Sequence, residues 1–363
     1  MTDIVPFLKS LVSVSGLSAY ESPVARLIEE TWKPLVDEVS VSRLGSLHGL
    51  KKGRAKSPLA LRPSAHPSIM IATHMDAIGL IVTQVIDGFI HLEAIGGIDP
   101  RILPGTPVIV HGRQDLPGVV VMPPMKTLPE DQRDGAIGLP HLLADVGLLP
   151  SKVTSLVRVG DLVSFDTQPV DLAGETLSGH SLDNRASVAA LTVCLQELQG
   201  KSHVWDVWAV ATSQEEVTLG GSATSAFDLH PDLAVVVDVT FGKGPGANGW
   251  ETFPLGEGPT LGWGANLHPF LYKKFKELAD RLEIPVAMEL VPLHSGTDAY
   301  SIQAAREGIP TMLLEIPMRY MHTPVEVISI KDVQRVGRLL SEFISGLQLD
   351  FISTIVWEEE AQE

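Results

Sequence analysis

The chain has 363 residues, 44% of them hydrophobic, and carries a formal net charge of −17 at pH 7. Its length suits a large core and suggests two domains, or one domain with an insert. The negative charge opposes nucleic acid and anionic membranes as partners, whereas it is compatible with metal cations and peptide ammonium groups. No apolar run is long enough to span a bilayer, and no export signal marks the N-terminus. Together with the single cysteine, Cys194, which fits a reducing compartment, this predicts a cytoplasmic protein.

Apolar residues recur at helical spacing between residues 4 and 36 and are interrupted at 13–16, which predicts two helices. A short strand is expected at 38–42. The basic, proline-containing stretch 48–67 is expected to be an exposed loop.

The apolar run 68–72 predicts a buried strand, and residues His74 and Asp76 follow at its carboxyl end. They are two positions apart, so an extended chain turns both side chains to the same side. A carboxylate beside the second nitrogen of a metal-ligating imidazole is a common arrangement. An ordinary strand end with a chance His-x-Asp sequence is the alternative.

From about residue 79 to residue 170, short runs rich in valine and isoleucine alternate with glycine and proline turns. This pattern predicts a small β-barrel or sandwich, so we expect an inserted β domain at 79–170 and an α/β domain made of 1–78 and 171–363. The polar stretch 127–149 predicts a short helix and a lid or contact loop. The expected strands are 80–85, 89–93, 107–110, 118–122, 156–159 and 161–165, and His91, His111 and His141 are interpreted as ordinary residues.

After the insert, Asp183 lies at or near the start of a helix that is predicted to end at about residue 198. Aspartate is a good N-cap residue, and a carboxylate is also able to bridge two cations. The residues alone leave both roles open. His180 is expected only to line a site.

Glu215 and Glu216 follow an apolar run at 204–210 and precede a Gly-Gly turn. Adjacent glutamates are usually exposed, but this run predicts a central strand, and open α/β sheets bind ligands at the carboxyl ends of such strands. Two more apolar strands, at 232–240 and 310–316, lead to Asp238 and to a loop that contains His322. The remaining predictions are helices at 268–282 and 330–347 and a strand at 284–290.

Two imidazoles and three carboxylates thus stand at strand ends or in adjoining loops of one α/β domain: His74, Asp183, Glu216, Asp238 and His322. This mixture suits zinc or cobalt better than calcium or magnesium. Five side chains exceed the need of one tetrahedral catalytic ion, but they suffice for two ions if one carboxylate bridges. Paired ions roughly 3.5–4 Å apart can hold a hydroxide and polarise a carbonyl. Glu215, beside Glu216, is the expected general base.

Six motifs in the chain together resemble those of the tetrahedral, dodecameric, dinuclear metallo-aminopeptidases, whose members have also been described as glutamyl aminopeptidases or endoglucanases. The resemblance extends from about residue 5 to residue 347. The motifs are His74-Met75-Asp76, Leu182-Asp183-Asn184-Arg185, Gln214-Glu215-Glu216-Val217, Val237-Asp238-Val239-Thr240, Gly296-Thr297-Asp298-Ala299 and Arg319-Tyr320-Met321-His322-Thr323-Pro324.

The resemblance implies a zinc-peptidase (phosphorylase/hydrolase-like) α/β fold, with a mixed-sheet catalytic domain and an inserted small β-barrel dimerisation domain. It implies dimers that assemble into a hollow dodecamer enclosing the active sites. It also assigns roles by position: one metal is held by His74 and Asp238, the other by Glu216 and His322, with Asp183 bridging, Glu215 as general base and Asp76 orienting His74.

The chain departs from the family pattern at two places near the expected ligands. Asn184 stands where a second aspartate is usual, which reduces the charge around the metals. After Thr240, the loop 241–246 replaces a segment in which another aspartate is usual. A third departure is that the segment 43–46 lacks the asparagine common there.

These features predict an aminopeptidase that removes N-terminal residues from short peptides with two zinc or cobalt ions. Another amide hydrolase, such as a deacylase or carboxypeptidase, is the nearest alternative. A catalytically silent, metal-holding assembly protein is the alternative from another class, but it has no need for Glu215 beside the metals. A glycosidase is disfavoured because its two carboxyl groups act without a metal.

Overall fold

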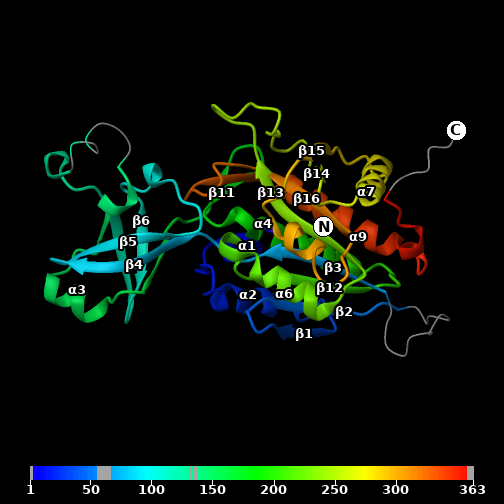
Figure 1. Cartoon of the computed structure of the whole chain (residues 1–363), viewed down its shortest axis with the longest axis horizontal. Helices are drawn as coiled ribbons and strands as arrows, with labels where there is room; N and C mark the ends of the chain where they lie inside the picture. Colours follow the sequence, from blue (N-terminus) through cyan, green and yellow to red (C-terminus); the bar gives the residue numbers. More distant parts are fainter. Residues whose placement is uncertain (1–2, 55–66, 129, 131–132, 134–136, 358–363) are drawn as a thin grey trace.

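The computed structural model describes residues 3–54, 67–128, 130, 133 and 137–357. These residues form a mixed α/β domain and, to one side of it, a separate β-barrel (Figure 1). The predicted fold class, a mixed sheet with an inserted small barrel, is therefore confirmed. None of the helices in the described ranges combines the length and apolarity needed to cross a lipid bilayer.

The α/β domain is assembled from the two ends of the chain. Its helices are α1 (Val5–Val12), α2 (Ser22–Trp32), α4 (Leu182–Leu198), α5 (Glu215–Thr218), α6 (Gly220–Leu229), α7 (Pro269–Arg281), α8 (Asp298–Gln303) and α9 (Ile330–Gly346). Its strands are β1 (Glu38–Val41), β2 (Leu47–Lys51), β3 (Ser68–His74), β10 (Val170–Leu172), β11 (Thr176–Gly179), β12 (Asp206–Thr212), β13 (Leu233–Phe241), β14 (Thr260–Gly264), β15 (Ala287–Val291), β16 (Thr311–Arg319) and β17 (Glu326–Ser329).

Four central strands of the sheet, β12, β3, β13 and β16, are parallel neighbours. β1 and β2 on one side, and β17, β11 and β10 on the other, pair antiparallel, while β14 pairs antiparallel with β16 and parallel with β15. Ile69 and Ile71 of β3 face the core formed with α4 and α9, whereas Met70 and Ala72 face the core formed with α6 and α8. Because helices cover both faces, these strands are continuous apolar runs. Their carboxyl ends lie next to one another at the same end of the sheet.

Strand β2 corrects one expectation. The exposed loop was expected to begin at residue 48, but all five residues of β2 are buried between β1 and β12. The polar residues in β2 find partners there: His48 Nε2 is 2.9 Å from Ser225 Oγ, and Lys51 Nζ donates to Leu35 O. Residues 55–66 of that expected loop lie outside the described residues.

The β-barrel closes in the order β4-β5-β8-β7-β6-β9 and has its own apolar core. Its elements are β4 (Gly79–Ile86), β5 (Phe89–Ile95), β6 (Pro107–His111), β7 (Asp115–Val121), β8 (Leu143–Asp145), α3 (Pro150–Leu156) and β9 (Leu162–Phe165). Single turns of 3-10 helix lie at Pro100–Ile102, Met125–Thr127, Leu139–His141 and, near the C-terminus, Phe351–Thr354.

One strand expected in the insert is absent, and one strand that forms was not expected. The strand predicted at 156–159 is absent, because Pro150 starts helix α3 and the buried Val153 and Val157, one helical turn apart, pack on the barrel core. In the stretch 127–149, of which 129, 131–132 and 134–136 lie outside the described residues, a single 3-10 turn at Leu139–His141 stands where a short helix was expected. The stretch also contributes strand β8, which was not predicted and which completes the barrel between β5 and β7.

Helices α4 and α9 approach each other closely at Gly337, where an added Cβ would lie 2.6 Å from both Ala190 O and Val193 Cβ. We expect Gly337→Ala to separate the helices and to lower the unfolding free energy by about 1–3 kcal/mol, since the core is already filled there. Gly346→Ala, in the last turn of the same helix, is the control, because its added Cβ would meet no atom within 4 Å. Thermal unfolding compares them, and equal melting temperatures would contradict the close contact.

Candidate metal centre

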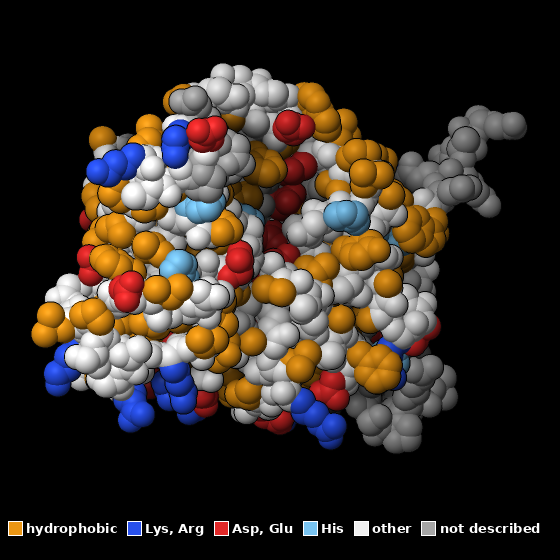
Figure 2. Space-filling model, turned by 60° about the vertical axis from the view of Figure 1, so that its left-hand side comes forward, with side chains coloured by type: hydrophobic (Ala, Val, Ile, Leu, Met, Phe, Trp, Pro, Cys, Tyr) orange, Lys and Arg blue, Asp and Glu red, His pale blue; other side chains and the backbone are white. Residues whose placement is uncertain are grey.

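The candidate residues gather at the carboxyl edge of the central strands, as the strand ends predicted. His74 is the last residue of β3 and lies in register with Thr212, the last residue of β12. Asp238 lies in the neighbouring β13, which also runs parallel to β3. All five candidate ligands and Glu215 line one cleft of about 760 Å³. Acidic side chains gather in a hollow on the face shown in Figure 2.

Asp183 lies between the two candidate histidines. Its Oδ1 atom is 3.0 Å from His74 Nε2, and its Oδ2 atom is 3.4 Å from His322 Nε2. The backbone of Asp183 is extended (φ −76°, ψ 104°), and the Asp183–Asn184 peptide is cis. Of the two roles that the sequence left open, the geometry favours the bridging carboxylate, because both oxygens face imidazoles.

The candidate ligands form two groups that share Asp183. One group contains His74 and Asp238, with 3.6 Å between Nε2 and Oδ1, and the other contains Glu216 and His322, with 3.4 Å between Oε2 and Nε2. Within each group the ligand atoms lie within 4.8 Å of one another, and the described residues contain no further group of this kind. Imidazole nitrogens and carboxylate oxygens at this spacing fit divalent transition-metal ions.

The two adjacent glutamates reach the same cleft because the chain turns at Gln214. This residue has a left-handed backbone (φ 59°), and α5 follows it immediately. Glu216 Oε2 faces His322, while Glu215 Oε2 lies 3.8 Å from His74 Nε2. In an extended segment these neighbours would point to opposite sides.

Asp76 fixes this turn as well as flanking His74. Its carboxylate accepts hydrogen bonds from the Glu215 amide at 3.0 Å, the Glu216 amide at 3.2 Å and the Ser18 hydroxyl at 2.6 Å. His74 Nδ1 is 3.2 Å from the Asp76 backbone oxygen and 3.5 Å from its Oδ1. Asp76 therefore lies beside His74 as expected, and it also positions the start of α5.

Sequence reasoning missed two further carboxylates that position the cleft. Glu326 accepts the Asp183 amide at 3.1 Å and the His322 amide at 3.2 Å, one with each oxygen. Glu21 Oε1 accepts the Gln214 amide at 3.0 Å. Glu326 could have been recognised as an acidic residue at the start of an apolar strand. Glu21 precedes a helix and looks like a surface residue in the sequence.

The cleft gathers more negative charge than it balances by itself. Burial, reinforced by Asp183, raises the pKa of Glu216 to about 8, and burial raises the pKa of Glu215 well above its usual range. The hydrogen bond with Asp183 raises the pKa of His322 to about 9. Burial alone would raise the pKa of Asp183, but hydrogen bonds with His322 and His74 outweigh it and lower that pKa. Such a cluster favours the entry of cations.

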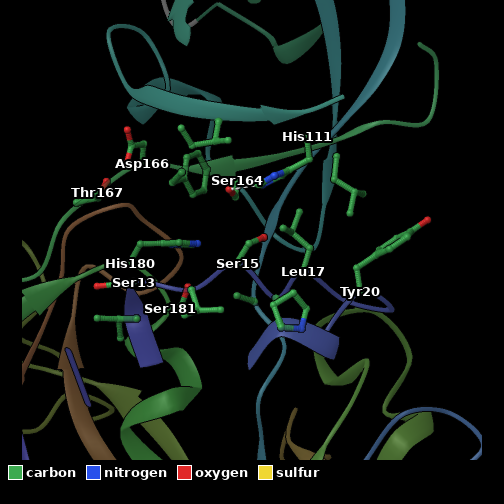
Figure 3. A pocket seen from close by; sticks show the side chains of 18 of the residues that line it. Ser13, Ser15, Leu17, Tyr20, His111, Ser164, Asp166, Thr167, His180 and Ser181 are labelled. Atoms are coloured by element: carbon green, nitrogen blue, oxygen red, sulfur yellow. Dashed lines mark hydrogen bonds between the residues drawn. The ribbon is translucent and has the colours of Figure 1, made fainter. Parts of the chain in front are cut away.

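A second cavity, of about 720 Å³, lies between the barrel and the α/β domain. Figure 3 shows His111 and Ser164 across from Ser15 and Leu17 in this cavity. His180, which was expected to line the site, lines this cavity and not the acidic cleft, and burial lowers its pKa to about 3. His111 lies 2.8 Å from both Asp115 Oδ1 and Ser164 Oγ, and it belongs to neither candidate ligand group.

One departure from the family pattern lines the cleft, and the other two lie near it. The Asn184 amide group donates to Val237 O at 2.9 Å, next to Asp238. An ionised aspartate has no proton to donate in this way. Phe241, which begins the divergent loop, lines the cleft and has 57% of its surface exposed. The segment 43–46 contacts the chain just before the turn at Gln214, because Leu44 O accepts a hydrogen bond from the Ser213 hydroxyl.

Comparison with known proteins places this geometry in a family. Residues 58–339 match the family model of the M42 glutamyl aminopeptidases. The lysyl aminopeptidase of Pyrococcus furiosus is 31% identical over 95% of this chain and 98% of its own length.

Solved structures agree with this match. The TET aminopeptidase of a marine-sediment Thaumarchaeota archaeon has 27% identity and a TM-score of 0.89, over 98% of this chain and 100% of its own. The TET1 peptidase of Pyrococcus horikoshii is described as assembling into a tetrahedron or a large octahedral shell. It has 26% identity and a TM-score of 0.80, over 95% of this chain and 100% of its own. The chain therefore belongs to the M42 glutamyl aminopeptidase family, and it is an aminopeptidase, a hydrolase of peptide bonds.

Proposed function

We propose that this aminopeptidase removes N-terminal residues from short peptides with two divalent metal ions and Glu215 as general base. The observation that carries the proposal is the pair of ligand groups that share Asp183, with Glu215 facing the same cleft. His74 and Asp238 would hold one ion, and Glu216 and His322 the other. Zinc and cobalt both suit this donor set.

The chain's own residues supply the proton transfers and the positioning. When bound, the two ions would polarise the scissile carbonyl and lower the pKa of the attacking water. The Glu215 carboxylate takes a proton from that water and passes it to the nitrogen of the leaving amine. Asp76 holds the Glu215 amide, and this contact keeps the carboxylate directed into the cleft.

Replacement of the proposed base tests this mechanism. Glu215→Gln keeps the size of the side chain but removes the proton acceptor, so we expect kcat to fall by roughly 10²–10⁴-fold with the metal content unchanged. Removal of the metals with a chelator should abolish activity, and addition of zinc or cobalt should restore it. The measurement is release of the N-terminal residue from a tripeptide, with the exposed Glu251→Gln as control variant.

Full activity in either the chelated protein or Glu215→Gln would overturn the mechanism. Acetylation of the peptide's N-terminus separates the rival amide hydrolases. An aminopeptidase loses this substrate, whereas a deacylase retains it. Absence of hydrolysis by the metal-loaded protein would favour a silent, metal-holding protein.

Glu326 is proposed as a positioning residue for the metal centre, because its two oxygens hold the amides of Asp183 and His322. Glu326→Gln leaves one oxygen acceptor, so one of these amides loses its partner. We expect the affinity for the cations to fall by roughly 10–100-fold, the usual effect of removing support from a ligand. Chelator competition measures this affinity, with Glu251→Gln as control. Unchanged affinity in a folded Glu326→Gln protein would contradict the role.

We propose that the chain forms homodimers through the inserted barrel and that the dimers assemble into a dodecamer in the cytoplasm. The TET1 relative that assembles into a tetrahedron supports the assembly. Apolar side chains on the barrel surface support its contact role: Ile86, Phe89, Val119, Met122 and Met125 are each at least 37% exposed. Sedimentation or light scattering should give a mass near twelve subunits of 39.1 kDa each. A mass near one subunit would rule out the assembly.

A further inference from the structure

A second acidic pair lies in the cleft, outside both candidate ligand groups. Glu289 belongs to β15 and Glu315 to β16, and β14 pairs with both of these strands. Both glutamates line the same cleft as Glu215 and Asp238. Neither belongs to the two groups that share Asp183, and the mechanism proposed above does not use them.

The carboxylate of Glu289 is held in a fixed position. Its Oε1 atom accepts a hydrogen bond from the Thr240 hydroxyl at 2.7 Å, and its Oε2 atom accepts one from the Thr260 hydroxyl at 2.6 Å. Thr240 lies two residues after Asp238 on β13, so this contact ties the second pair to the strand that carries a proposed ligand. The geometry is that of a preorganised acceptor and not of a mobile surface glutamate.

Glu315 has an unsatisfied oxygen. The side chain lines the cleft although the residue is only 5% exposed, and its Oε2 atom has no hydrogen-bond partner among the described residues. A buried carboxylate oxygen without a donor is unfavourable. Burial, reinforced by repulsion from Glu289, raises the pKa of Glu315 well above its usual range. A donor that enters with positive charge would satisfy this oxygen and offset the repulsion.

The charge balance of the cleft points to a cation that comes with the substrate. Glu289 and Glu315 have no positive side chain beside them in the cleft, since no lysine or arginine of the described chain lines it.

We propose that Glu289 and Glu315 form a subsite for the cationic side chain of the N-terminal residue, so that the enzyme prefers peptides that begin with lysine or arginine. This inference rests on the proposed aminopeptidase function and names its substrate class. Phe241 and Tyr300, 57% and 48% exposed, also line the cleft and offer apolar surface to the methylene stem of such a residue. The alternative is that the pair shares a proton and only joins strands of the sheet.

The test compares p-nitroanilides of lysine, arginine, norleucine and glutamate with the metal-loaded enzyme. Norleucine has an unbranched stem like that of lysine without the charge. We expect kcat/KM for lysine to exceed that for norleucine by roughly 10–100-fold, the value of a charge-assisted hydrogen bond. Glu289→Gln and Glu315→Gln should lower the ratio of kcat/KM for lysine to kcat/KM for norleucine toward one. Glu251→Gln, which is exposed and outside the cleft, should retain the wild-type pattern.

Equal hydrolysis of the lysine and norleucine substrates by the wild-type enzyme would overturn the subsite, and this result needs no variant to fold. A parallel loss on all four substrates in both variants would assign the pair a structural role instead. Hydrolysis of norleucine without a preference for lysine leaves the proposed aminopeptidase function standing. Absence of hydrolysis of every substrate would overturn that function, and the subsite with it.

Discussion

The constraint on which the rest of the structure depends is the repulsion among carboxylates gathered in one partly enclosed cleft. The side chains of Asp183, Glu215, Glu216 and Asp238 are largely buried, and among the described residues His74 and His322 are the basic side chains within 4.0 Å of their oxygens. A chain free to relax would move these groups apart or protonate them. The fold prevents separation by fixing the backbone that carries them. His74 and Asp238 sit on parallel strands whose apolar side chains are packed on both faces of the sheet.

The loops at this edge have no such packing, and buried carboxylates hold them instead. Asp76 accepts the amides that begin α5, and Glu326 accepts the amides of Asp183 and His322. Hydrogen bonds to backbone amides hold these loops without bringing another formal charge into the cleft. Burial, reinforced by Asp183, raises the pKa of Glu326 well above its usual range. Arg185, which is fully buried, also contacts the backbone and donates to the oxygens of Leu11 and Met75.

Local patterns in the sequence were enough to predict an α/β domain, an inserted β domain that was a barrel or a sandwich, and the collection of candidate ligands at the strand ends. The mixed sheet and the choice of a barrel came from the family resemblance. His74 and Asp238 could be recognised because each lies near the end of an apolar strand. The different roles expected for Glu215 and Glu216 required a turn in the chain between the strand and these residues. Long-range contacts were not predictable in this way: Glu326 and Asp183 are 143 residues apart, and Asp76 and Glu215 are 139 apart. The exposed loop predicted from residue 48 was wrong because residues far away in the sequence bury this segment. In β2, for example, the imidazole of His48 contacts the hydroxyl of Ser225. The three-residue strand β8 was missed because so short a run has no periodicity of its own.

Asn184 shows how a departure from the family pattern fits the same physical constraint. Its Nδ2 donates to Val237 O, so the start of α4 is tied to the strand that carries Asp238. Asp183 and Asp238, the bridging and terminal ligands proposed for one ion, are therefore linked through their immediate neighbours. An ionised aspartate at position 184 would repel Val237 O and add charge to the cleft, whereas the asparagine amide donates a hydrogen bond and adds none. The substitution reduces the charge near the metal centre while keeping a contact that fixes its geometry. Glu289 and Glu315 line the same cleft without a lysine or arginine of the described chain beside them, and the proposed substrate cation would supply the positive charge there.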